Sequence, residues 1–118
     1  MTRFDFARFL SKPEALRALP GAKGERFREL FRHGSLAVEI YAPVGTDPQT
    51  PHTRDELYVI ASGTGWFHSG EQRQAFTPGT LLFVPAGVKH HFADFSADFS
   101  AWVMFFGPDG GTASITLD

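Results

Sequence analysis

The stretch Gly79-Thr80-Leu81-Leu82-Phe83-Val84-Pro85-Ala86-Gly87-Val88-Lys89-His90 joins a short apolar run to a Pro-Xaa-Gly turn and a histidine that opens the next run. Short β-rich runs separated by glycine and proline turns continue from it in both directions. The runs that we predict as strands are 25–33, 35–42, 55–62, 64–69, 72–77, 80–84, 90–95, 100–106 and 112–117. Many short strands at close spacing are typical of a β-sandwich or barrel, so we predict an all-β fold.

Residues 4–19 have the one helical pattern in the chain, because their apolar residues recur at steps of three and four. Ser11, Pro13 and Glu14 are typical of a helix N-cap, a first-turn proline and a capping box. We therefore predict two short helices in an N-terminal segment, residues 1–24, followed by a β-barrel over residues 25–118. Together they form a single domain, residues 1–118.

The composition excludes several classes of function. Eleven basic and 13 acidic residues give a net charge of −2, which argues against a nucleic-acid partner. The absence of cysteine excludes disulfides and cysteine nucleophiles. No apolar run approaches the roughly 18 residues of a membrane span, and the N-terminus lacks a signal-peptide pattern. We expect a cytoplasmic protein with no membrane partner.

Two predicted strands are apolar on both faces, which bears on assembly. Leu57 and Val59 alternate with Tyr58 and Ile60, and residues 102–106 are apolar throughout. A strand with one face in water should alternate apolar with polar residues. Two short helices are too small to cover both segments, so we predict a homodimer.

A second informative stretch precedes the strand at 55–62. If that strand runs unbroken from residue 50, His52, Glu56 and Tyr58 share one face, because strand side chains repeat every two residues. His90 is the candidate third group, from another strand. Two imidazoles and one carboxylate suit a divalent first-row metal ion and leave positions open for water or substrate.

These two stretches resemble the two motifs of the cupin superfamily. The first family motif is Gly, five residues, His-Xaa-His, three or four residues, Glu, six residues, Gly. In this chain Gly45 is followed by four residues, Thr50 occupies the first His position, and His52, Glu56 and Gly63 fit the remaining spacings.

The second family motif is Gly, five residues, Pro-Xaa-Gly, two residues, His, three residues, Asn. Gly79, Pro85, Gly87 and His90 fit every spacing, and Asp94 stands where Asn is usual. The resemblance covers roughly residues 35–107 and implies a double-stranded β-helix, or jelly-roll barrel, of the small bacterial type.

The resemblance also implies a function. Metal-binding cupins usually supply three histidines and one glutamate; here Thr50 departs from that set, which leaves a metal site of His52, Glu56 and His90. The ion would be Fe, Mn, Ni, Co or Zn. An enzyme of this kind would be a dioxygenase-like or isomerase-like protein acting on a small organic molecule, with Tyr58 as the candidate catalytic proton donor. The alternatives are a non-catalytic small-ligand-binding or sensor cupin and a metal-free sugar epimerase-like cupin.

Several residues near these motifs have competing structural interpretations. Arg54 shares the predicted face of Glu56 and could pair with it in place of a metal. His91 should point away from the barrel interior, and we expect His33 and His68 to be structural or exposed. Asp55 and Asp94 are expected to be turn and hydrogen-bonding residues, and the aromatic side chains are expected to fill the core.

Overall fold

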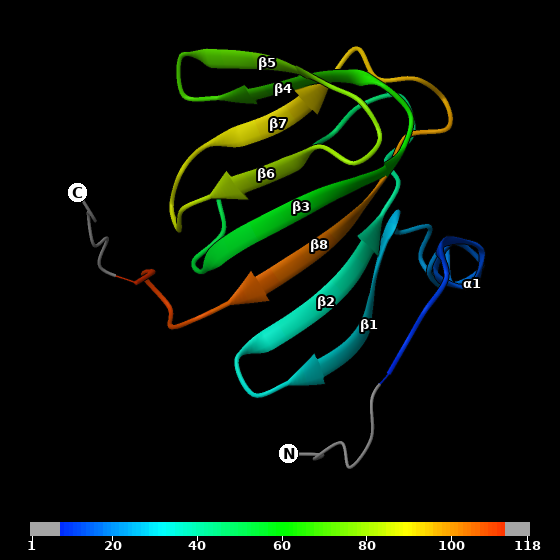
Figure 1. Ribbon diagram of the computed structural model, residues 1–118, viewed down its shortest axis with the longest axis horizontal. Coiled ribbons are helices and arrows are strands. Elements are labelled where there is room, and N and C mark those ends of the chain that lie inside the picture. Colours follow the sequence, from blue (N-terminus) through cyan, green and yellow to red (C-terminus); the bar gives the residue numbers. More distant parts are fainter. Residues whose placement is uncertain (1–7, 113–118) are drawn as a thin grey trace.

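The computed structural model describes residues 8–112, which form eight strands and one short helix. The strands are β1 Phe27–His33, β2 Leu36–Tyr41, β3 Asp55–Ser62, β4 Gly65–Ser69, β5 Gln72–Phe76, β6 Leu81–Val84, β7 His90–Ala93 and β8 Ser100–Phe106. They form an antiparallel five-stranded sheet in the order β1-β2-β8-β3-β6 and a three-stranded sheet in the order β5-β4-β7 (Figure 1). The all-β prediction is confirmed.

Strand pairing decides which side chains face the interior. In β3, Glu56 pairs with Phe105 of β8 and Tyr58 pairs with Val103, so these side chains lie on the same face of the sheet. This face meets the three-stranded sheet in a buried aromatic and aliphatic core. The core residues are Tyr58, Ile60, Phe67, Phe76, Val84, Phe92, Phe99, Ala101 and Val103. The alternation along β3 therefore places Glu56 at the edge of the core, one repeat before Tyr58.

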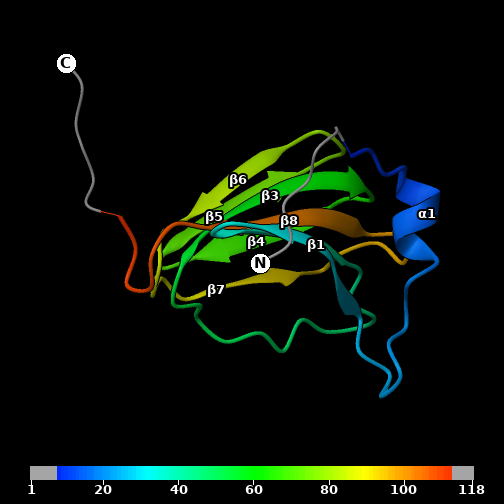
Figure 2. The ribbon, with the colours of Figure 1, turned by 90° about the horizontal axis from the view of Figure 1, so that it is seen from below.

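The N-terminal segment contains one helix among the described residues, α1 Lys12–Leu16. The Ser11 side chain accepts a hydrogen bond from the Glu14 N–H and contacts the Glu14 carboxylate, as the capping pattern predicted. The other predicted helix falls partly on residues outside the described range, and residues 8–10 are not helical. The helix α1 lies at one end of the molecule, beside β1 (Figures 1 and 2). No helix within residues 8–112 is long and apolar enough to cross a membrane.

The strand predictions agree with the structure except near the first motif. The ninth predicted run, 112–117, lies almost wholly outside the described residues. The continuation of β3 back to residue 50 is wrong, because β3 begins at Asp55 and residues 42–54 form a long connection from β2. Pro48 and Pro51 explain the difference, since a proline has no N–H to donate to a strand ladder.

Candidate metal site

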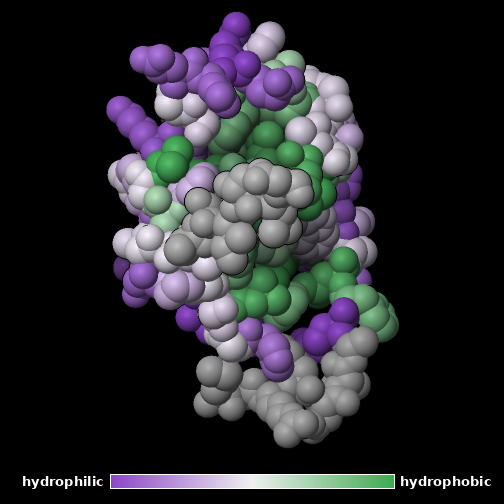
Figure 3. Space-filling view, turned by 60° about the vertical axis from the view of Figure 1, so that its left-hand side comes forward, coloured by the Kyte–Doolittle hydropathy of each residue, from purple (hydrophilic) through white to green (hydrophobic). Residues whose placement is uncertain are grey.

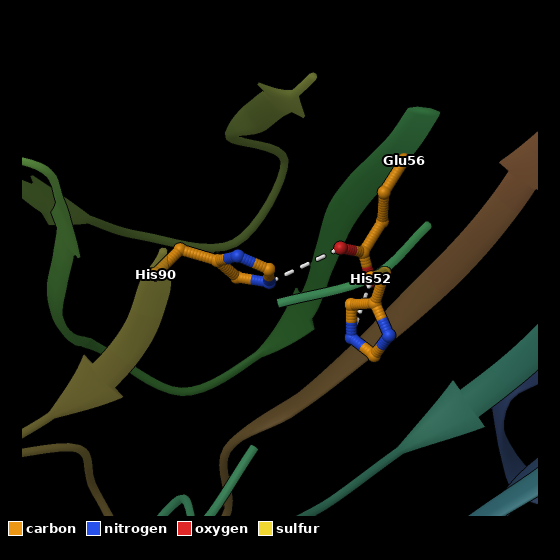
Figure 4. Close-up of side chains that lie close together, drawn as sticks. All are labelled: His52, Glu56 and His90. Carbon is orange, nitrogen blue, oxygen red and sulfur yellow. Dashed lines mark ion pairs between the residues drawn. The ribbon is translucent and has the colours of Figure 1, made fainter. Parts of the chain in front are cut away.

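Three side chains that are far apart in sequence converge inside the molecule. His52 comes from the connection before β3, Glu56 from β3 and His90 from β7, and their side chains point toward one another (Figure 4). One ligand atom of each lies within 4.8 Å of the others. The His90 Nε2 to Glu56 Oε1 distance is 3.1 Å, and the His52 Nε2 to Glu56 Oε2 distance is 3.8 Å. The structure thus brings together the three residues that the motifs indicated.

His90 is held in one orientation by the turn that precedes it. Its Nδ1 lies 2.9 Å from the Val88 carbonyl oxygen. A carbonyl only accepts hydrogen bonds, so Nδ1 carries a proton and Nε2 is the nitrogen directed at Glu56. Burial lowers the pKa of His90, but contact with Glu56 and the Val88 carbonyl outweighs it, and the pKa is raised overall. The site therefore favours a cation at this nitrogen, which is either a proton or a metal ion in its place.

His52 reaches the site from a loop rather than from a strand. The Gly87 N–H of the Pro-Xaa-Gly turn donates to the His52 carbonyl over 2.7 Å, which fixes the loop at this residue. Asp55 strengthens the same junction by accepting a 3.0 Å hydrogen bond from the Ala86 N–H. The shared-face argument is therefore wrong for His52, which reaches the cluster from the loop, and its role as a metal ligand stays a prediction. The same argument also fails for Arg54. Its side chain does not pair with Glu56 and donates instead to the Ser35 carbonyl over 2.6 Å.

Glu56 is the most informative member of the cluster. Its side chain is 1% exposed, and Oε1 accepts no hydrogen bond from the described residues. Oε1 instead lies in ion-pair contact with His90 Nε2 at 3.1 Å, and a buried carboxylate is costly unless a cation balances its charge. The positive charge that would balance the Glu56 carboxylate can come from the two neighbouring imidazoles, if they are protonated, or from a metal ion bound between them. The chemistry of the donor set therefore fits a divalent metal ion.

The spacing of the donor atoms leads to the same conclusion. Two donors that bind one ion at about 2.1 Å, with roughly 90–110° between them, lie about 3.0–3.4 Å apart. The 3.1 Å separation of His90 Nε2 and Glu56 Oε1 falls in this range, and the 3.8 Å separation of His52 Nε2 and Glu56 Oε2 is slightly wider. Small movements of the half-buried His52 would close the difference.

Tyr58 lies directly beside this cluster. Its hydroxyl is 3.0 Å from His90 Nε2 and donates to the Gln49 Oε1 over 2.9 Å. Burial, and then the nearby charge of Glu56, raise the pKa of Tyr58 far above its ordinary value. The phenol is therefore a protonated hydrogen-bond donor at neutral pH. Its assignment as a catalytic group stays a prediction.

A cavity of about 610 Å³ opens onto the site. Its walls include His52, Glu56, Tyr58 and the inner-face residue Glu39. Burial, with the neighbouring charge of Glu29 as a smaller cause, raises the pKa of Glu39 to about 7. A cavity of this size holds a small organic molecule.

Sequence reasoning missed a group of polar residues in the connection between β2 and β3. The Asp47 carboxylate accepts hydrogen bonds from the Tyr41 hydroxyl, the Gln49 amide and the Phe92 N–H. Gln49 in turn contacts Tyr58 and His52. No period or motif marks these residues, because they lie in an irregular loop.

The remaining predicted positions agree with their structural interpretations. His91 points away from the site and stacks on His68 of the neighbouring strand, with ring centroids 4.7 Å apart. Asp94 has φ 50°, a left-handed conformation that Asn and Asp tolerate better than most residues. This backbone requirement accounts for Asp94 at the Asn position of the second motif.

A family model described as a cupin domain matches residues 37–104, more than half of the chain. The chain belongs to the cupin family. The match includes His52, Glu56 and His90, so this cupin has its candidate site within the family domain.

Individual relatives agree with this assignment. An uncharacterized protein of Streptomyces coelicolor is 33% identical to the cupin over 98 residues, which covers 81% of this chain and 93% of the relative. A solved cupin barrel from Salinispora arenicola has a TM-score of 0.65 at 17% identity, covering 89% of this chain and 91% of that one. A proposed mannose-6-phosphate isomerase from Ralstonia eutropha has a TM-score of 0.55 at 21% identity, covering 70% and 83%. These likenesses confirm the jelly-roll fold of the cupin.

Proposed function

We propose that this cupin binds a divalent first-row transition metal ion through His52, Glu56 and His90 and acts on a small organic molecule in the adjoining cavity. The observation that supports the proposal is the buried Glu56 carboxylate, whose two oxygens lie 3.1 Å from His90 Nε2 and 3.8 Å from His52 Nε2. When bound, such an ion acts as a Lewis acid that polarises an oxygen atom of the substrate. Imidazole and carboxylate ligands fit Fe, Mn, Ni, Co and Zn alike.

The chain itself would orient the substrate and hold a proton. Tyr58 keeps its phenolic proton beside the site, where it could donate to a substrate oxygen in exchange for Gln49 Oε1, which accepts this proton in the structure. Val103 and Phe105 form apolar cavity walls that exclude water from the reacting groups. A protonated donor next to a Lewis acid suits isomerase-like chemistry, in which a proton moves on an oxygen-bearing substrate. A dioxygenase-like reaction requires a redox-active ion, so activity with Fe²⁺ but not Zn²⁺ would favour it.

Replacement of Glu56 by glutamine tests the metal proposal directly. We expect Glu56→Gln to weaken Co²⁺ binding by more than the roughly 10–100-fold that loss of a supporting partner costs. We expect the metal-free variant to lose less than the roughly 3–5 kcal/mol of unfolding free energy that breaking a buried ion pair costs, because the glutamine amide can still donate to His90. Isothermal titration with Co²⁺ and urea unfolding in chelator measure the two quantities.

Glu39→Gln is the matched control, since Glu39 lines the same cavity but lies outside the cluster. It should change Co²⁺ affinity by a much smaller factor than Glu56→Gln does. Equal affinities of the wild type and Glu56→Gln for Co²⁺, or no binding by the wild type, would refute the metal proposal.

We also propose that the cupin forms a homodimer through the outer face of the five-stranded sheet. Leu81 and Phe83 of β6 are 62% and 55% exposed, and they pair with Val59 and Leu57 of β3, whose side chains lie on the same face. Figure 3 shows hydrophobic surface exposed on one side of the molecule among hydrophilic residues. Exposed apolar side chains that gather on one face are typical of a protein interface.

Light scattering tests the homodimer. We expect a mass of twice the 13.0 kDa of one chain at micromolar concentration, and the monomer mass for Phe83→Glu, because a charge at the centre of an apolar interface is strongly disfavoured. Gln74→Glu adds the same charge to the exposed strand β5 and should leave the dimer intact. A monomeric wild type, or a dimeric Phe83→Glu, would contradict this interface.

A further inference from the structure

The amide group of Gln49 faces the His52–Glu56–His90 cluster. Its Oε1 accepts a hydrogen bond from the Tyr58 hydroxyl over 2.9 Å and lies 3.3 Å from His52 Nε2. Gln49 also lines the cavity that opens onto the site. An amide oxygen has two lone pairs, so accepting from Tyr58 leaves it one for a second partner.

The orientation of this amide is fixed by Asp47. The Gln49 Nε2 donates to Asp47 Oδ2 over 2.5 Å. A carboxylate only accepts hydrogen bonds, so the NH₂ end of the amide must face Asp47 and the oxygen must face the cluster. Asp47 itself is held from both sheets, by the Tyr41 hydroxyl of β2 and the Phe92 N–H of β7. The oxygen of Gln49 is therefore presented to the site by an ordered network.

The position of this oxygen matches that of a further ligand. The 3.3 Å between Gln49 Oε1 and His52 Nε2 falls within the roughly 3.0–3.4 Å expected for two donors on one ion. Thr50, which occupies the first His position of the family motif, is exposed, and a neutral hydroxyl is a poor ligand for these metals. Gln49, the residue before Thr50, thus offers an oxygen ligand that Thr50 does not.

We propose that Gln49 supplies an amide oxygen as the fourth protein ligand of the divalent metal ion held by His52, Glu56 and His90. This inference rests on the proposed metal-binding function. It makes the donor set two nitrogens and two oxygens in place of the three nitrogens and one oxygen usual in metal-binding cupins. It also gives Asp47 a positioning role, because Asp47 decides which end of the amide faces the ion.

The test uses Co²⁺ alone as the probe, with isothermal titration and the visible absorption spectrum of the saturated protein. We expect Gln49→Ala to weaken Co²⁺ binding about tenfold or more and to change the ligand-field bands at saturation. Gln49→Glu keeps an oxygen at this position but loses the NH₂ that Asp47 accepts, so it should bind Co²⁺ more tightly than Gln49→Ala without reaching the wild-type affinity. Thr50→Ala, the neighbouring control, should leave both the affinity and the spectrum at their wild-type values.

The spectrum separates a ligand from a residue that merely supports the loop. A structural role alone would weaken binding in Gln49→Ala without changing the ligand-field bands at saturation, and that result would overturn the inference.

Asp47→Asn is a second test of the same inference. Asparagine can present its NH₂ to Gln49 and turn the amide oxygen away from the cluster, so we expect weaker Co²⁺ binding. Wild-type affinity in Gln49→Ala while Glu56→Gln loses binding would overturn this inference alone. Absence of binding in the wild type would instead refute the proposed function on which it rests.

Discussion

Saturating Co²⁺ is expected to raise the melting temperature of the wild-type cupin by about 10 °C. An ion that binds the folded chain and not the unfolded one stabilises the fold by mass action, by about 2.7 kcal/mol at a hundredfold excess over its dissociation constant. Each kcal/mol moves the melting temperature of a domain of this size by several degrees. Thermal melts with Co²⁺ and with chelator measure the shift.

His90→Ala should abolish this shift. Two remaining protein ligands among His52, Glu56 and His90 hold a divalent ion poorly, and Glu56 loses its nearest cationic neighbour. The metal-free variant is also expected to be less stable, since breaking a buried ion pair costs about 3–5 kcal/mol. The decisive quantity is therefore the difference between melts with and without Co²⁺, not the melting temperature itself.

His91→Ala is the matched control, because His91 lies next to His90 but stacks on His68 away from the site. It should keep the full Co²⁺-dependent shift. A metal-loaded wild type that melts at the same temperature with and without chelator would contradict the linkage between metal and stability. Loss of the shift in His91→Ala but not in His90→Ala would mean that the wrong histidine is assigned.

Local physical rules predict the strands, the two candidate ligands Glu56 and His90, and the neighbouring Tyr58. Glu56 and Tyr58 lie on one face of β3 because strand side chains alternate, and the pairing with β8 confirms it. His90 opens β7 directly after a Pro-Xaa-Gly turn, so its position also follows from the sequence pattern. These features depend on contacts close in sequence, which periodicity describes well.

The loop residues could not be predicted in the same way. His52 was found by motif spacing, whereas its actual support is a hydrogen bond from Gly87, 35 positions further along the chain. Asp47 and Gln49 contact the site only because β2 and β7 are brought together by the fold. An irregular loop has no period, so its side-chain directions depend on tertiary contacts that a single sequence does not display.

The motif glycine Gly63 also depends on a contact with a residue far along the chain, and Gly63→Ala has a large expected effect on stability. Gly63 has φ +86°, and a Cβ built on it would lie 2.6 Å from Phe99 Cα and 2.9 Å from Phe99 N. Phe99 belongs to the buried core, so its backbone has little room to move. Left-handed strain costs about 1–2 kcal/mol and overpacking about 1–3 kcal/mol, so we expect a loss of about 3 kcal/mol or more. Urea unfolding of the metal-free protein measures it.

Gly79→Ala separates the two causes, because Gly79 has a similar φ of +91° but no heavy atom within 4 Å of a Cβ built on it. This variant should lose only the left-handed strain, about 1–2 kcal/mol. The difference between the two variants then measures how closely the turn between β3 and β4 approaches the loop before β8. Equal losses would show that backbone conformation alone requires Gly63, and that Phe99 yields to an added methyl group. A larger loss in Gly63→Ala, with the dependence on urea concentration unchanged, is the result that the close contact predicts.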